Sequence, residues 1–229
     1  MESIARGAAI LGSGGGGDTG IGLLIARQAV EEAGPVELVG LDELPSEGLV
    51  LPCGGMGAPT VSFEKLESGD EGERLRDAVE QTFGRGVVAV MASEIGGSNA
   101  LTPIAWAAHM SLPVVDADGM GRAFPELHQV AMHLAGIAPT PAFLTDERGN
   151  LLVTRAVSGP WLERIHRQVT MELGGAASTA EYVMSVAQAR EASILGTISL
   201  AMRIGAALSL DALVEMVHAH RRSDFPSLP

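Results

Sequence analysis

The chain has 229 residues, of which 46% are hydrophobic, and this is enough to bury one sizeable core. Its 28 acidic side chains outnumber its 15 basic ones and give a net charge of −13, which argues against nucleic acid and anionic membrane as partners. The single cysteine, Cys53, excludes an intrachain disulfide, and no apolar run suits a membrane span or a secretory signal. We therefore expect a cytoplasmic protein whose ligand is a small molecule or another protein.

The first motif is a glycine loop, LGSGGGGDTGIG, at residues 11–22. Gly12, Gly14 and Gly17 have the spacing of a dinucleotide fingerprint, and Asp42 follows at a distance that suits a ribose contact. Four consecutive glycines satisfy many patterns by composition, however, and the carboxylate of Asp18 would repel a phosphate. Nucleotide binding therefore stays a minor alternative.

Two other interpretations of this loop remain open. In one, Asp18 or Thr19 caps the following helix and the glycines only turn the chain. In the other, Gly15 and Gly16 form a pocket wall that offers backbone N–H groups, and Asp18 faces a polar ligand. We favour the pocket wall, because a turn needs fewer glycines.

Strand-like and helix-like segments alternate along the next part of the chain. Strands are predicted at 35–41, 48–54, 86–93 and 112–118, a hairpin at 141–154, and helices at 21–34 and 72–84. This alternation is typical of an α/β fold with a layered mixed, mostly parallel sheet and covering helices.

Beyond Gly174 and Gly175 the composition becomes rich in alanine and other helix formers, and Ser178 or Thr179 suits an N-cap. We expect an α/β core over residues 1–175 and a helical C-terminal section over 176–229, packed together as one domain. The HAH sequence at 218–220 is expected in a solvated helix end.

Polar side chains follow two of the predicted strands. Glu94 ends the strand at 86–93, and Asn99 lies near the start of the next helix. Asp116 and Asp118 end the strand at 112–118, and Arg122 follows in a glycine loop. Because ligands bind at the carboxyl ends of strands in open α/β sheets, we expect these residues and Asp18 in a common hollow. Glu94, Asp116, Asp118 and Arg122 are the catalytic candidates, with a carboxylate activating water.

Other polar residues near these strand ends are candidates for binding a substrate or a metal. Pro125 introduces a predicted helix in which His133 lies seven residues after Glu126, two turns along the same face. Glu126 is a substrate-binding candidate, and Asp118 with His133 is a candidate metal site. In the alternative, Asp118 caps a turn, Glu126 complements the helix dipole and His133 is a core residue.

Three sulfur-containing residues lie near glycine turns. Met56 and Met120 are candidates for the apolar lining of a substrate pocket, although ordinary packing explains them equally well. Cys53 could be an exposed thiol, but no neighbouring motif supplies a base for it.

Four segments resemble the S-methyl thiohydantoin desulfurase family, a former domain of unknown function that accompanies hydantoinase and oxoprolinase subunits. They are IARGAAILGSGGGGDTGIG, GMGAPTVSFEKL, EIGGSNALTPIAWAA and PVVDADGMGRAFPELHQVAMHLAGIAPTPAFLTDERGN. The resemblance covers about residues 3–155 and continues more loosely through GTISLAMRIGAAL. Matching residues include Asp18, Glu94, Asn99 and Asp116, whereas His128 stands where glutamine is expected.

The resemblance implies a hydrolase that releases methanethiol from an S-methylated thiohydantoin ring and leaves a hydantoin. The cofactor is left open, with zinc as the candidate metal. Family members continue into a further C-terminal domain, and we expect this chain to be a short form that lacks it. The alternative function is a non-catalytic small-molecule-binding or assembly subunit of a hydantoinase-type system. A homo-oligomer or a hydantoinase-type partner subunit would complete the site.

Overall fold

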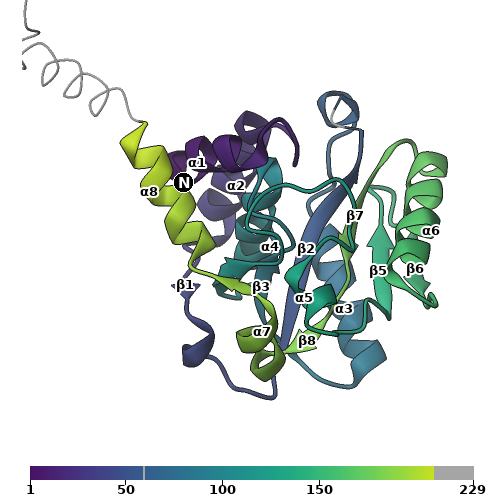
Figure 1. Ribbon diagram of the computed structural model, residues 1–229. Helices are drawn as coiled ribbons and strands as arrows, with labels where there is room; N and C mark the ends of the chain where they lie inside the picture. Colours follow the sequence, from purple (N-terminus) through teal and green to yellow (C-terminus); the bar gives the residue numbers. More distant parts are fainter. Residues whose placement is uncertain (59, 209–229) are drawn as a thin grey trace, which may run out of the picture.

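The computed structural model describes residues 1–58 and 60–208 (Figure 1). The HAH sequence at 218–220 lies outside the described residues, as does the end of the predicted C-terminal section. The helices are α1 (Glu2–Gly12), α2 (Thr19–Ala33), α3 (Glu71–Phe83), α4 (Thr102–Met110), α5 (Ala131–Leu134), α6 (Gly159–Glu172), α7 (Val186–Ala192) and α8 (Thr197–Ala207). The strands are β1 (Leu38–Val39), β2 (Leu49–Gly57), β3 (Val87–Ala92), β4 (Val114–Asp118), β5 (Ala142–Thr145), β6 (Leu151–Thr154), β7 (Ala176–Ala180), β8 (Met184–Ser185) and β9 (Ile194–Leu195).

The strands form one mixed sheet in the order β1-β4-β3-β2-β7-β5-β6, with β8 paired to β2 and β9 to β4. The pairs among β1, β4, β3 and β2 are parallel, whereas β2–β7, β7–β5 and β5–β6 are antiparallel. The predicted α/β class, the strands β2 to β4 and the hairpin β5–β6 are therefore confirmed. So are the predicted helices, which appear as α2 and α3.

Each face of the sheet carries its own hydrophobic core. Along β2 the side chains alternate, so that Leu49 and Leu51 enter one core and Val50 enters the other. The first core is closed by α1, α2, α3, α4 and α8, and the second by α5, α6 and α7. In Figure 1, α8 and α6 lie at opposite sides of the molecule, with the sheet between them. No helix among the described residues is long and apolar enough to cross a bilayer.

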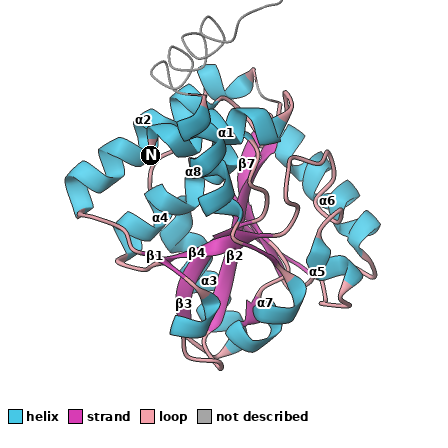
Figure 2. Cartoon of the chain, turned by 60° about the vertical axis from the view of Figure 1, so that its left-hand side comes forward, coloured by secondary structure: helices cyan, strands magenta, loops and turns pink. Residues whose placement is uncertain are grey.

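The first and last described helices pack against each other. A Cβ at Gly7 would lie 1.9 Å from the Ala201 carbonyl oxygen, and one at Gly205 would lie 1.8 Å from that of Ser3. Only glycine permits the two backbones to approach so closely. Figure 2 shows α1, α2 and α8 gathered together.

The prediction of a helix that starts at Pro125 is wrong. The chain forms turns there and then the four-residue helix α5. The Leu127 N–H donates to Glu163 Oε2 at 3.0 Å, and the Ala131 N–H donates to the Gly119 carbonyl at 2.7 Å. In a helix that began at Pro125, the Ala131 N–H would donate to the Leu127 carbonyl. Because it donates to Gly119 instead, a continuous helix does not run from Pro125 through Ala131.

The C-terminal section is helical in α7 and α8, but it begins with a strand. Residues 176–180 form β7, which pairs with β2 on one side and β5 on the other. Ser178 and Thr179 are therefore strand residues, and the N-cap expected at either of them is wrong. The cap that does form is Ser185, whose Oγ accepts from the Gln188 N–H at the start of α7. Here sheet pairing overrides the helix propensity of the alanines.

Candidate functional site

The glycine loop connects two helices, α1 and α2, and not a strand with a helix. A dinucleotide fingerprint requires a strand before the loop, so the fingerprint interpretation of these glycines is wrong. Asp18 is the N-cap of α2, because its Oδ1 accepts from the Ile21 N–H at 2.9 Å. Gly16 has a φ of +77°, and a Cβ there would lie 2.1 Å from the Gly96 carbonyl oxygen, so this position requires glycine.

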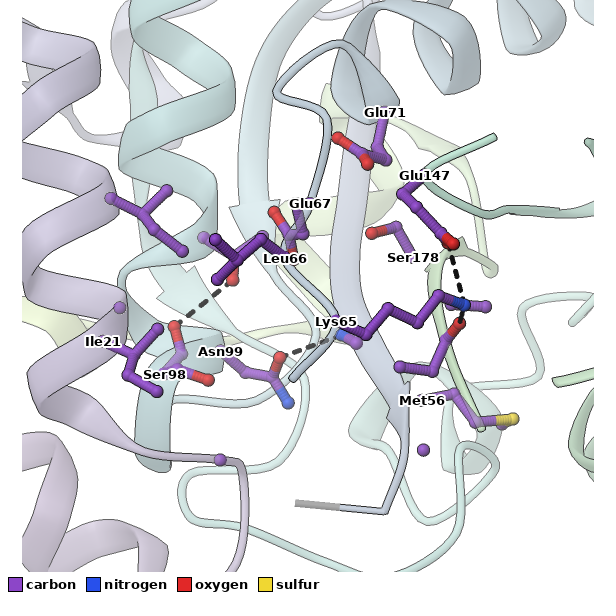
Figure 3. A pocket seen from close by; sticks show the side chains of 18 of the residues that line it. Ile21, Met56, Lys65, Leu66, Glu67, Glu71, Ser98, Asn99, Glu147 and Ser178 are labelled. Carbon is purple, nitrogen blue, oxygen red and sulfur yellow. Dashed lines mark hydrogen bonds and ion pairs between the residues drawn. The ribbon is translucent and has the colours of Figure 1, made fainter. Parts of the chain in front are cut away.

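The same loop lines a pocket of about 200 Å³ on the α2 and α4 side of the sheet (Figure 3). Its walls come from the glycine loop, the end of β2 with the segment that follows it, the start of α4, the β5–β6 turn and β7. The apolar part of the lining comprises Ile21, Ile25, Met56, Leu66, Leu101 and Ala105. The polar part comprises Asp18, Lys65, Glu67, Glu71, Ser98, Asn99, Thr102, Thr145, Asp146, Glu147 and Ser178.

Lys65 is the lysine in this wall, and protein groups occupy its donors. Its Nζ lies 2.8 Å from Glu147 Oε2, 2.6 Å from the Leu173 carbonyl oxygen and 2.9 Å from that of Ala176. An ammonium group has three N–H donors, so all of them are used. Lys65 thus ties the segment after β2 to the start of β7, and its charge is balanced by Glu147.

Glu67 and Glu71 stand on the same side of the pocket in Figure 3. Glu71 is 1% exposed and accepts from the N–H groups of Ser68 and Gly69 at 2.7 and 2.9 Å. Glu67 keeps an exposed side chain, and it takes no hydrogen bond from the described residues. Surrounding protein nevertheless raises the pKa of Glu67 to about 7 by removing water, and the Glu71 carboxylate raises it further. Glu67 can therefore exchange protons near neutral pH.

Asn99 and Glu94 form another corner of the pocket region, and each side chain is only 7% exposed. Asn99 Nδ2 donates to Glu94 Oε1 at 2.6 Å, and Asn99 Oδ1 accepts from the Gly55 N–H at 2.9 Å. Glu94 Oε2 also accepts from the Phe124 N–H at 3.2 Å. Burial raises the pKa of Glu94 above its ordinary value, although the hydrogen bonds from Asn99 and Phe124 oppose this. Asn99 lines the pocket itself, whereas Glu94 lies behind it.

The two aspartates at the end of β4 do not line this pocket. Asp118 is fully buried and accepts from the N–H groups of Ile95, Met120 and Gly121 at 2.8 to 3.0 Å. Burial raises the pKa of Asp118 to about 6, although these hydrogen bonds oppose the shift. Asp116 accepts from the N–H and the Oγ of Ser199 at 3.0 and 2.5 Å, which ties β4 to α8. Asp116 and Asp118 therefore do not share this pocket with Asp18 and Asn99, as the expected common hollow required.

Four further predicted residues also lie away from the pocket. Arg122 is exposed, and its guanidinium lies 5.5 Å from the centre of the Phe124 ring. Glu126 is exposed and lies 3.4 Å from His128 Nε2. Met120 packs on the second core, and Gly15 is not part of the lining. Of the predicted substrate-binding residues, the pocket brings together Gly16, Asp18, Met56 and Asn99.

The residues proposed for a metal do not fit one. Both oxygens of Asp118 accept backbone hydrogen bonds, and His133 Nδ1 lies 3.1 Å from the Tyr182 hydroxyl. Within residues 1–58 and 60–208, no three His, Cys, Asp or Glu side chains cluster as metal ligands do. We therefore derive no chemistry through zinc. Cys53 is fully buried, so the exposed thiol considered for it is wrong.

Sequence reasoning missed the acidic wall of the pocket. Lys65, Glu67 and Glu71 lie in turns and at a helix start, whereas Asp146 and Glu147 follow β5 in the turn of the hairpin, which was expected only to reverse the chain. One signal was available, because Lys65 belongs to the GMGAPTVSFEKL segment that carries part of the family resemblance.

Comparison with known proteins agrees with that resemblance. Residues 1–156 match the model of the S-Me-THD-like N-terminal domain, and residues 157–221 match that of the S-Me-THD-like C-terminal domain. The expected absence of a C-terminal domain is therefore wrong. The pocket uses both matched parts, since its lining joins the first to Ala176, Ala177 and Ser178 of the second.

A solved structure is also similar. It is the X-ray structure of a protein from Chromobacterium violaceum, with 28% sequence identity and a TM-score of 0.77. The match covers 97% of this chain, which spans 64% of the length of that protein. No curated protein matches the chain. With family models matching nearly its whole length, the chain belongs to the S-Me-THD-like family.

Proposed function

We propose that this protein is a hydrolase that releases methanethiol from an S-methyl thiohydantoin-like ring bound in the pocket. The family supports the substrate class. The observation that carries the proposal is Glu67, a carboxylate without a hydrogen bond from the described residues, in a pocket that also contains Asn99. The apolar residues Ile21, Leu66 and Met56 supply contacts for a small ring and its methylthio group.

In the proposed reaction the Glu67 carboxylate removes a proton from water, whose oxygen attacks the ring carbon that bears the methylthio group. The electron pair of the C=N bond moves to the ring nitrogen. When the carbonyl re-forms, the proton of the new hydroxyl passes to the ring nitrogen, the C–S bond breaks, and the thiolate takes the proton from Glu67. One water is consumed, and one methanethiol and one hydantoin are formed. A base with a pKa near the working pH suits this role.

Among the residues first considered for catalysis, Glu94 has a supporting part because it holds Asn99. Asp116, Asp118 and Arg122 have no part in the proposal, since they are engaged away from the pocket.

The test is methanethiol release by the purified protein, followed with a thiol reagent against a heat-denatured control. We expect release to increase with pH through about 7, because only ionised Glu67 acts as a base. Binding of the thiohydantoin without release would overturn the proposal and favour the non-catalytic binding subunit. A rate that falls as the pH rises would exclude a carboxylate base.

A further inference from the structure

Asn99 is held from several sides at the start of the region that leads into α4. Its side chain bonds to Glu94 and to the Gly55 N–H, and its backbone N–H donates to the Gly16 carbonyl at 3.2 Å. Gly16, Gly55 and Asn99 all line the pocket. The amide therefore stands at the pocket surface with little freedom to turn.

The chemistry of its two partners fixes which way the amide faces. A backbone N–H can only donate, so the Gly55 N–H requires the oxygen of Asn99, and the NH₂ group that then faces Glu94 donates to its Oε1. Asn99 must therefore turn its NH₂ group toward Glu94 and its oxygen toward Gly55. One of the two N–H bonds of Nδ2 is used by Glu94. The other has no acceptor among the described residues.

We propose that Asn99 donates this second N–H to an acceptor atom of the ligand ring, and that Glu94 is the positioning residue that keeps a donor at this point. A carbonyl oxygen or an imine nitrogen of a hydantoin-type ring is such an acceptor. The choice of a hydantoin-type ring rests on the proposed function. That Asn99 offers the ligand a hydrogen-bond donor, and not an acceptor, rests on its hydrogen bonds to Glu94 and Gly55 alone. In a purely structural role, the pair would only link the start of α4 to β2.

Exchanging the hydrogen-bond donor and acceptor between positions 99 and 94 separates the ligand-binding role of this pair from the purely structural one. Asn99→Asp sets two carboxylates against each other and should lower the melting temperature. In the double variant Asn99→Asp/Glu94→Gln, the glutamine amide introduced at position 94 can donate to the new carboxylate, and the Gly55 N–H can still donate to it. The double variant should therefore recover stability, while the pocket now presents lone pairs in place of an N–H.

The measurement is calorimetric binding of hydantoin, together with thermal unfolding, for wild type, both single variants and the double variant. We expect the double variant to melt near the wild type but to bind hydantoin about tenfold more weakly or worse. The matched control is Glu80→Gln, because Glu80 also accepts a backbone N–H, from Val87 at 2.8 Å, but does not line the pocket. Its hydantoin affinity should be unchanged.

Wild-type affinity in the stable double variant would overturn the proposal, and so would failure of the wild type to bind hydantoin. If the double variant does not regain stability, Glu94→Gln alone decides. Glu94→Gln should weaken hydantoin binding, because the amide at position 94 can turn its own N–H toward Asn99. Unchanged hydantoin affinity in this variant would contradict the positioning role of Glu94. None of these measurements requires methanethiol release. If the variants lose hydantoin affinity as expected but the protein releases no methanethiol, only the proposed function is refuted, and the role of Asn99 stands.

Discussion

Asp118 at the end of β4 and Glu67 in the pocket are both carboxylates with raised pKa values, but they differ in the source of their hydrogen bonds. Asp118 is fully buried and accepts from three backbone N–H groups of the chain. Glu67 is exposed to the pocket and accepts from no described residue. A carboxylate that accepts hydrogen bonds from backbone N–H groups stabilises a turn, whereas a carboxylate without such bonds can bind a ligand. A position at a strand end does not by itself distinguish the two.

The largest effect that this comparison predicts is on stability. Asp118→Ala leaves three buried N–H groups without an acceptor, and we expect a loss of about 3 kcal/mol in the free energy of unfolding. Glu67→Ala should not lower it, because the carboxylate that is removed accepts no hydrogen bond from the described residues, and its raised pKa means that its charge opposes folding at neutral pH. Urea denaturation of both variants measures the difference. Equal losses would remove the distinction between the two sites.

A smaller effect concerns the glycine wall of the pocket. Gly16→Ala brings a Cβ onto the Gly96 carbonyl at a positive φ, and we expect it to cost about 2 kcal/mol. Gly14 is the matched control, because its φ is also positive, at +92°, but a Cβ there meets no atom of the described residues within 4 Å. Gly14→Ala should cost about 1 kcal/mol, from backbone strain alone. A Gly16→Ala protein as stable as Gly14→Ala would show that the wall moves freely.

The fold could be predicted further than the site. Apolar periodicity located β2, β3, β4, α2 and α3, because each buries a regular face against a core. It failed for β7 and for the segment behind Pro125, where the deciding hydrogen bonds come from residues distant in sequence. Sequence spacing carries no information about such partners.

For the site, the rule that ligands bind at strand ends identified Asn99 and Glu94 but also selected Asp116 and Asp118. The sequence shows that a carboxylate is near a turn, but not whether backbone N–H groups will fill its lone pairs. Glu67 could not be separated from the other acidic residues, because its distinguishing property is the absence of such partners among the described residues.

The most direct test compares methanethiol release by Glu67→Gln and Asp116→Asn, two variants that each replace a carboxylate by an amide of the same shape. Asp116 was a catalytic candidate from sequence, yet its carboxylate bonds to Ser199 away from the pocket. We predict that Asp116→Asn keeps wild-type release and that Glu67→Gln loses it by about a hundredfold or more. Release that survives in Glu67→Gln and disappears in a folded Asp116→Asn would contradict the assignment of the site.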